Sequence, residues 1–169
     1  KKKKISSLST FSSQEFDLSK KKAVRSLSKR YQKDCTIIFC SGIKKQYGDN
    51  LNIFDLNIKI ITNFAKSLNT NVKKIIYFSS ASVYGEDKLH KKRINENTEL
   101  NLKSYYGLSK FISERILEKT AKELGIKLII FRIPLVYGVG DSTKGYGPSD
   151  FINSFIDSRP ITLWGKGDE

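Results

Sequence analysis

The sequence predicts an α/β protein in which a parallel β-sheet is doubly wound by helices. Three short runs, 36–40, 72–78 and 126–131, are apolar at most positions, as is typical of strands buried on both faces of a sheet. Between them, apolar residues recur every three or four positions, which indicates amphipathic helices. Strands that alternate with helices pair in parallel, because each helix returns the chain to the start of the next strand.

The first part of the chain contains one predicted helix and one predicted strand. Residues 1–15 are rich in serine and lysine without periodicity, and we expect them to be loose. Ser19 is expected to cap a helix, whose apolar positions are Val24, Leu27 and Tyr31. The strand at 36–40 then ends at a Ser-Gly turn.

Two longer helices are predicted beyond this point. Residues 52–68 carry a helical apolar repeat formed by Ile53, Leu56, Ile60, Phe64 and Leu68. A long polar loop is expected over 79–103. Ser104 then caps a helix that ends at Gly125, with a packed face formed by Leu108, Ile112, Ile116 and Leu124. A further helix at 149–158 leads to a short apolar run at 161–164.

Composition limits the classes of protein. A chain of 169 residues that is 38% apolar can bury one core. No apolar run is long enough for a membrane span, and the four N-terminal lysines are not followed by a signal-like segment, so a cytoplasmic protein is expected. The chain contains no methionine, and we expect it to be incomplete at both ends.

The cysteines and the single histidine indicate no metal site. Cys35 and Cys40 are five positions apart in an apolar run, on opposite faces of a strand, and are expected to be buried reduced thiols. With His90 as the only histidine, zinc coordination and a Ser-His-Asp triad are both disfavoured.

The formal net charge of +14 raises a nucleic-acid-binding alternative. Most of the lysines are spread along the chain in pairs, as on ordinary solvated surfaces, so that reading is disfavoured. A positive field would also attract an anionic substrate such as a sugar diphosphate.

The strongest chemical signal is a tyrosine and a lysine on the helix capped by Ser104. Tyr106 and Lys110 are four positions apart and therefore share one helical face. A phenol has a pKa near ~10, and a neighbouring ammonium favours its phenolate, which could then act as an acid or base. Ser80 follows a predicted strand and could hydrogen-bond the same substrate oxygen. A Tyr-x-x-x-Lys pair alone is a weak signal.

Three ordered blocks make the signal specific: Phe78-Ser79-Ser80-Ala81-Ser82-Val83-Tyr84-Gly85, Tyr106-Gly107-Leu108-Ser109-Lys110 with Glu114, and Phe131-Arg132-Ile133-Pro134-Leu135-Val136-Tyr137-Gly138-Val139-Gly140. In this order and spacing they resemble the NAD-dependent epimerase/dehydratase family of extended short-chain dehydrogenases, over roughly residues 17–169. The resemblance implies a Rossmann-like partial dinucleotide-binding domain at 16–139 and the start of a smaller substrate-binding domain at 140–169.

The resemblance also implies roles for individual residues. Ser80, Tyr106 and Lys110 correspond to the family's catalytic residues. The implied NAD-binding positions are Asp17, Cys40, Ser41, Gly42, Lys44, Phe78, Ser79, Tyr106, Lys110 and Pro134. The implied substrate-binding positions are Ser80, Ala81, Ser82, Tyr106 and Leu135. For Asp17, Cys40 and Ser41, a purely structural role in a turn or at a strand end remains an alternative.

The chain also departs from the family pattern. The first glycine is Gly42, so the family's first β-α-β unit, with its glycine-rich pyrophosphate turn, has no counterpart, and we expect the chain alone to be inactive. Ala81 and Ser82 replace the Asp-Glu pair of dehydratases, and Leu135 replaces a common sugar-gripping asparagine. These differences favour epimerisation over dehydration, although dehydration and keto reduction stay open.

The sequence thus predicts a nucleotide-sugar epimerase that works by transient hydride transfer to NAD, with NADP not excluded. The expected partner is a nucleotide-diphosphate sugar, with no nucleic acid and no membrane, and a homodimer is possible on family grounds. A non-catalytic binding module is the alternative from another class. Neither the sugar nor the nucleotide can be read from these residues.

Overall fold

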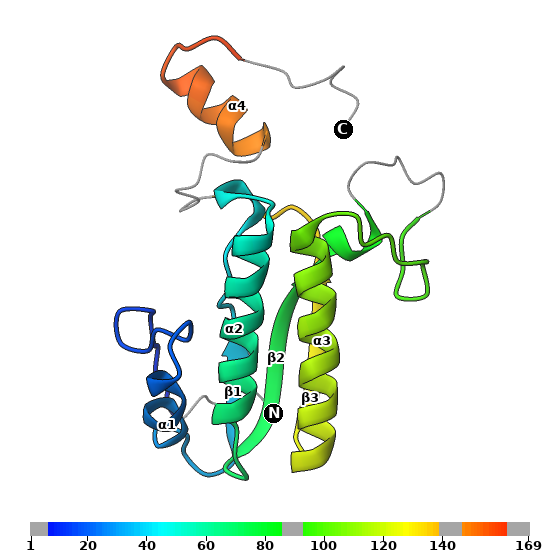
Figure 1. The fold of residues 1–169 in the computed structure, drawn as a ribbon. Helices are drawn as coiled ribbons and strands as arrows, with labels where there is room; N and C mark the ends of the chain where they lie inside the picture. The colour runs from blue at the N-terminus through cyan, green and yellow to red at the C-terminus, as the bar shows by residue number, and fades with distance from the viewer. Residues whose placement is uncertain (1–6, 86–92, 139–146, 162–169) are drawn as a thin grey trace, which may run out of the picture.

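The computed structural model describes residues 7–85, 93–138 and 147–161, and it confirms an α/β fold (Figure 1). Three strands, β1 (Cys35–Phe39), β2 (Val72–Ser80) and β3 (Lys127–Ile133), form a sheet in the order β1-β2-β3. Both neighbouring pairs are parallel. The carboxyl ends of the strands therefore lie at one edge of the sheet, where ligands bind in such folds.

Two long helices carry the chain between these strands. α2 (Leu51–Ser67) connects β1 to β2, and α3 (Tyr105–Leu124) connects β2 to β3. They lie side by side on one face of the sheet, and the shorter α1 (Lys22–Ser28) packs beside α2 (Figure 1). Two 3-10 turns, η1 (Lys45–Tyr47) and η2 (Ala81–Tyr84), follow the ends of β1 and β2. The last described helix is α4 (Gly147–Ile156).

The core lies between the sheet and the α2/α3 layer. The ring of Phe39 stacks on that of Phe64 in α2, with centroids 3.8 Å apart. Ile75, Tyr77 and Leu117 are almost completely buried beside them. Burial of this apolar surface, at roughly 25 cal/mol per Å², supplies the main force that holds both helices on the sheet.

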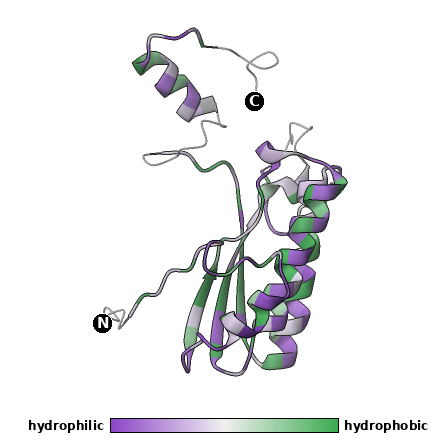
Figure 2. Cartoon of the chain, turned by 60° about the vertical axis from the view of Figure 1, so that its left-hand side comes forward, coloured by the Kyte–Doolittle hydropathy of each residue, from purple (hydrophilic) through white to green (hydrophobic). Residues whose placement is uncertain are grey.

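The opposite face of the sheet is less covered than the sequence predicts. Ile38 in β1 is 58% exposed and Phe131 in β3 is 47% exposed, so the expectation that these strands are buried on both faces is wrong for them. The neighbours of Ile38 in the strand, Ile37 and Phe39, pack against the core. In Figure 2 the strands, which contain many residues coloured as hydrophobic, lie to one side of the long helices.

The predicted cap of the first helix is wrong. Ser19 donates its hydroxyl to Asp17 Oδ1 at 2.6 Å and its backbone N–H to the same oxygen at 3.0 Å, which closes a local turn. The helix begins only at Lys22, and its N-cap residue, Lys21, makes no side-chain cap. Tyr31 lies beyond the helix, where its hydroxyl is 2.8 Å from Ser67 Oγ.

The predicted packed face of α3 is also wrong in part. The four large apolar residues expected there are only half-buried. The buried positions are mostly small or polar: Gly107, Ser109, Ser113, Glu114, Leu117 and Ala121. The helix packs against β2, η2 and α2, and Leu117 is the large apolar residue among its buried positions. In α2, Phe64 is buried as expected, as is Leu68 just after the helix, whereas Ile53, Leu56 and Ile60 are half-buried.

Other expectations have mixed outcomes. Cys35 and Cys40 are free thiols, but neither is buried as expected: Cys35 is half-buried in β1, and Cys40, which follows the last residue of that strand, is exposed. The predicted polar loop after β2 begins with η2, in which Val83 and Tyr84 are buried. The cap by Ser104 is confirmed, since its Oγ accepts a hydrogen bond from the N–H of Gly107 at 3.0 Å.

The C-terminal part is described only in places. The helix expected at 149–158 is α4, which begins and ends two residues earlier. Most of the apolar run expected at 161–164, together with Gly140, lies outside the described residues. The predicted domain boundaries stay predictions. Among the described residues, no helix has both the length and the apolar character needed to cross a membrane.

Candidate active site

Ser80 is the last residue of β2 and lies half-buried at the carboxyl edge of the sheet. Its Oγ accepts a hydrogen bond from the N–H of Ser82 at 3.2 Å and lies 2.9 Å from Ser82 Oγ, so it caps η2. The hydroxyl is therefore held at the point where the strand turns into η2, with a further hydrogen-bonding position available to a ligand.

Tyr106 and Lys110 lie on the first turns of α3, as the sequence predicts. The backbone N–H of Tyr106 donates to Asp49 Oδ1 at 2.9 Å, so a carboxylate from the loop before α2 supports the start of this helix. Lys110 Nζ lies 5.7 Å from the centroid of the Tyr106 ring. The amine and the phenol thus share one side of α3.

Lys110 is half-buried, and its amine lies beside the Tyr106 ring. Its Nζ donates to the backbone carbonyl of Phe78 at 3.0 Å and lies 5.3 Å from the Tyr77 ring centroid. Burial lowers the pKa of this amine to about 8, while Cys40 and Glu114 oppose that effect. The amine still carries its proton at neutral pH, and its charge favours ionisation of a nearby phenol.

The η2 turn and the start of α3 are in direct contact. A Cβ added to Gly107 would come within 2.6 Å of the Ser82 carbonyl oxygen, closer than real side chains allow. Only glycine permits this approach of the two backbones. Because Ser80 is two residues from Ser82 and Tyr106 adjoins Gly107, this contact brings the three predicted catalytic residues to one corner of the sheet.

The loop after β1 lies beside the same amine. Ser41 and Gly42 are exposed, and a Cβ on Gly42 would stand 3.7 Å from Lys110 Nζ. The side chain of Asn57 in α2 holds this loop, because it accepts from Ile43 N at 2.7 Å and donates to Ile43 O at 3.1 Å. Partial desolvation raises the pKa of the nearby Cys40 thiol, and Lys110 opposes that rise.

These residues fit the nicotinamide end of a dinucleotide. Small residues without bulky side chains follow β1, so that a ligand can approach the backbone, and a protonated amine lies directly behind them. Lys44, next along the loop, and Pro134, just after β3, are exposed. The glycine-rich turn that would bind the pyrophosphate is absent from the sequence.

Phe78 and Ser79, two of the predicted cofactor-binding residues, make contacts within the protein. The Phe78 ring stacks with that of Phe131, with centroids 6.0 Å apart, and the Phe78 carbonyl accepts the hydrogen bond from Lys110. The buried hydroxyl of Ser79 donates to Glu114 Oε1 at 2.6 Å.

Asp17 lies in the turn before α1. Its carboxylate accepts from Ser19 and pairs with Lys20 at 3.1 Å, and these interactions lower its pKa. Asn63 donates to the carbonyl of the adjacent Leu18. Asn50, the N-cap of α2, lies at the edge of the sheet that carries the predicted catalytic residues. Since a helix rises about 1.5 Å per residue, Asn63 lies roughly 20 Å farther along α2, so Asp17 is far from that edge.

The residues predicted to contact substrate border the same edge. Ala81 and Ser82 are half-buried in η2. Leu135 follows the end of β3 and is 60% exposed. Their side chains can supply one hydroxyl and apolar surface to a ligand but no carboxylate.

A network that the sequence analysis did not assign lies beneath this corner. Glu114 pairs with Arg132 through two hydrogen bonds, and Arg132 also donates to Tyr84. The available signal was the spacing of Tyr106, Lys110 and Glu114, which are four residues apart in turn. No local pattern identifies Asp49 or Arg132 as their partners, because both are distant in sequence.

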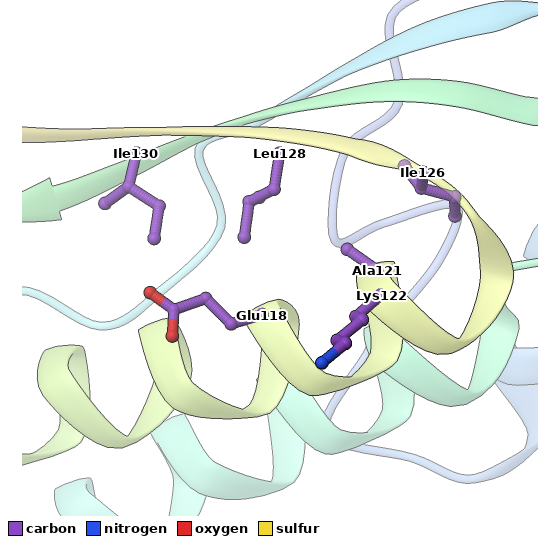
Figure 3. A pocket seen from close by; sticks show the side chains of 6 residues that line it. All are labelled: Glu118, Ala121, Lys122, Ile126, Leu128 and Ile130. Atoms are coloured by element: carbon purple, nitrogen blue, oxygen red, sulfur yellow. The ribbon is translucent and has the colours of Figure 1, made fainter.

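A hollow of about 380 Å³ lies elsewhere. Figure 3 shows it between α3 and β3, lined by Glu118, Ala121, Lys122, Ile126, Leu128 and Ile130. Ile126 lies just before β3 starts, so the hollow extends toward the amino ends of the strands. It contains none of the predicted site residues.

The parallel sheet, with its serine, tyrosine and lysine at the carboxyl edge, defines a Rossmann-type α/β domain. The model of the NAD dependent epimerase/dehydratase family matches residues 2–169, and the chain belongs to that family.

Curated relatives include epimerases and larger synthases. An uncharacterized UDP-glucose epimerase, YtcB, of Bacillus subtilis is 24% identical over 130 residues, which is 76% of this chain and 40% of the relative. A putative UDP-glucose 4-epimerase of Methanocaldococcus jannaschii is 29% identical over 119 residues, or 68% of this chain and 38% of the relative. Probable polyketide synthase 34 of Dictyostelium discoideum is 31% identical over 136 residues, 74% of this chain but 4% of the synthase.

Solved structures share the fold. The UDP-glucuronic acid 4-epimerase from Bacillus cereus in complex with NAD has a TM-score of 0.64 and 22% identity, covering 83% of this chain and 45% of that one. The RMD protein of Pseudomonas aeruginosa complexed with NADPH has a TM-score of 0.70 and 17% identity, covering 85% of this chain and 51% of that one. The chain thus spans about two fifths of the curated epimerases and about half of these structures.

Proposed function

We propose that this chain carries the catalytic corner of a nucleotide-sugar epimerase. The observation that supports this most directly is the position of Lys110, whose amine is anchored to the Phe78 carbonyl and lies 5.7 Å from the Tyr106 ring. A half-buried ammonium beside a phenol is a physical means of activating that phenol as an acid or base.

The three catalytic residues have distinct roles in this proposal. Ser80 hydrogen-bonds the substrate oxygen, and Tyr106 removes the proton from that oxygen and later returns it. Lys110 stabilises the phenolate of Tyr106. A bound nicotinamide would accept hydride from the sugar carbon and return it to the opposite face, which inverts that centre.

The proposed cofactor is NAD, with NADP not excluded. Ser41, Gly42 and Lys110, which lie together, would hold its nicotinamide end, and further contacts are proposed for Cys40, Lys44 and Pro134. Solved structures of the same fold contain NAD or NADPH. Contacts of Asp17 with the adenine end, and of Phe78 and Ser79 with the cofactor, stay predictions.

The proposed substrate is a nucleotide-diphosphate sugar, as the names of the two curated epimerases suggest. Dehydration across the sugar would need an extra acid and base next to Ser80, and Ala81 and Ser82 supply no carboxylate. Epimerisation needs only a proton carrier and hydride return. Homodimerisation and a cytoplasmic location also stay predictions.

The test is Tyr106→Phe in the intact protein, assayed with UDP-glucose and NAD. Loss of the hydroxyl should lower kcat by about 10³-fold or more, while NAD binding persists. Tyr105→Phe is a matched control, because Tyr105 is the preceding residue and its ring contact with Phe54 survives the change. Similar activity in the two variants would refute the role of Tyr106.

A second candidate is keto reduction in a polyketide synthase. Three curated relatives of Dictyostelium discoideum, probable polyketide synthases 34, 39 and 32, are 29–31% identical to this chain. Ser80, Tyr106 and Lys110 could equally protonate a carbonyl as it is reduced. NADPH oxidation with a β-keto thioester, in the absence of epimerisation of UDP-glucose, would favour this candidate.

A non-catalytic binding module predicts neither reaction. In that case sugar nucleotides bind, but no NADH absorbance appears when they are mixed with the protein and NAD. The nucleic-acid alternative predicts binding that weakens steeply with salt, and absence of retention on a filter at low salt would remove it.

A further inference from the structure

Beneath the candidate active site, one arginine connects three elements. Arg132 in β3 donates from Nε to Glu114 Oε1 at 3.0 Å and from Nη2 to Glu114 Oε2 at 2.8 Å. Its remaining terminal nitrogen, Nη1, donates to the hydroxyl of Tyr84 at 2.8 Å. The guanidinium also lies over the Tyr84 ring, 5.1 Å from its centroid.

The partners of Arg132 are deeply buried. Glu114 is 0% exposed, and Tyr84 is also buried. A carboxylate without solvent must be paired, and here Oε1 also accepts the hydroxyl of Ser79 at 2.6 Å. The two-pronged geometry uses the planar fork of arginine, which a lysine ammonium cannot reproduce.

The network joins the elements that carry the catalytic residues. Glu114 is one turn beyond Lys110 on α3, on the same helical face. Tyr84 closes η2, the turn that Ser80 caps. Arg132 bonds to both at once, and η2 and α3 also meet where the Gly107 backbone approaches the Ser82 carbonyl.

This arrangement goes beyond what burial of a charge requires. The Glu114 carboxylate is already satisfied by Ser79 and by two arginine nitrogens. The third arginine bond, to Tyr84, adds nothing to the pairing of Glu114. Its effect is to fix η2 relative to α3 and β3.

We propose that Arg132 and Glu114, acting through Tyr84, are positioning residues that hold η2 against α3, so that the Ser80 hydroxyl faces Tyr106 and Lys110. The inference rests on the proposed function for its catalytic consequence. It concerns residues that do not touch the substrate or the cofactor.

The decisive experiment compares Tyr84→Phe with Tyr31→Phe in the intact protein. Each change removes one buried phenol hydroxyl that makes a 2.8 Å hydrogen bond, to Arg132 in the first case and to Ser67 in the second. Tyr31 contacts the far end of α2, so it serves as a matched control for the loss of a buried hydrogen bond.

Amide hydrogen exchange is the first readout, and it needs neither substrate nor cofactor. In Tyr84→Phe, exchange in segments 80–85 and 104–110 should become at least about threefold faster, whereas in Tyr31→Phe it should not change there. Unchanged exchange in both segments of Tyr84→Phe would overturn the inference, whatever the activity of the protein.

Turnover of UDP-glucose with NAD is the second readout. Misplacement of Ser80 should lower kcat about 5- to 20-fold in Tyr84→Phe and leave KM within about twofold, whereas Tyr31→Phe should turn over normally. An equal loss of kcat in the two variants would show a general stability effect and overturn the inference. Absence of turnover in the wild-type protein would instead count against the proposed function, and hydrogen exchange would decide the positioning role.

Arg132→Lys provides a further check on the same question. The lysine keeps the positive charge beside Glu114, but it lacks the planar guanidinium that bonds to Glu114 and Tyr84 at the same time. The variant should therefore reproduce the exchange and kcat changes of Tyr84→Phe. Wild-type exchange and kcat in a folded Arg132→Lys would overturn the inference. If that variant does not fold, the Tyr84→Phe comparison stands by itself.

Discussion

Gly107→Ala tests whether the approach of η2 to α3 sets the geometry of the active site. In an isolated helix, alanine would be about 1 kcal/mol more favourable than glycine. Here the new Cβ would lie 2.6 Å from the Ser82 carbonyl oxygen and 3.1 Å from Ser104 Oγ. The backbones must separate by roughly half an ångström, at an overpacking cost of about 1–3 kcal/mol. We therefore expect a net loss of about 1 kcal/mol in the free energy of unfolding.

The same displacement should be visible in turnover. Because a shift of about 1 Å can cost 10²-fold in rate, half that shift should lower kcat by about tenfold. The assay combines urea denaturation with turnover of UDP-glucose in the intact protein.

Gly125→Ala is the matched control for this prediction. Gly125 ends the same helix at φ +68 with no atom within 4 Å of a Cβ, so it should lose about 1–2 kcal/mol through backbone strain and keep normal kcat. A Gly107→Ala protein that is more stable than wild type and fully active would refute the reasoning.

Three further predictions concern the same corner. Lys110→Met should stabilise the fold by up to about 3 kcal/mol at neutral pH, because the desolvated amine has a pKa of about 8 and is charged there. The unfolded chain holds that proton up to about pH 10.5, so the stability of the wild-type protein rises with pH between these two values and its difference from the variant should shrink. Urea denaturation that shows the same stability difference at all these pH values would contradict this prediction. Ser104→Ala should lower the free energy of unfolding by about 1 kcal/mol by removing the cap of α3, and Ser104→Asp should restore that stability. Equal melting temperatures of the two variants would count against the cap. Asn57→Ala should lower the free energy of unfolding by about 2 kcal/mol, because it removes both hydrogen bonds to Ile43. It should also weaken NAD binding in a fluorescence titration, and an unchanged affinity for NAD would show that the loop after β1 does not contribute to cofactor binding.

Much of the fold could be predicted because its signals are local. The apolar runs that became β1, β2 and β3 have the length and composition of buried strands, and parallel pairing follows from the helices between them. The start of α3 was correct because Ser104 carries its capping oxygen in the sequence itself. The failed prediction at Ser19 shows the limit of this signal, since Asp17 nearby takes both the N–H and the hydroxyl of that serine.

The buried face of α3 could not be predicted from periodicity. Large apolar residues recur along that helix, yet its buried positions are mostly glycine, serine and alanine, together with Glu114 and Leu117. How closely two backbones approach depends on the partner surface, which a helical repeat does not contain. The exposure of Ile38 and Phe131 has a similar origin, because it depends on which layers lie against each face of the sheet.

The sequence by itself determined the parallel α/β arrangement and placed Tyr106 and Lys110 on one helical face, because helical spacing is a property of adjacent residues. Only the tertiary structure decided what holds them. The Phe78 carbonyl that anchors Lys110, the Asp49 carboxylate at the N–H of Tyr106 and the Arg132 fork on Glu114 all come from distant parts of the chain. Such contacts depend on how strands and helices pack, and desolvation of the amine follows from that packing rather than from its neighbours in sequence.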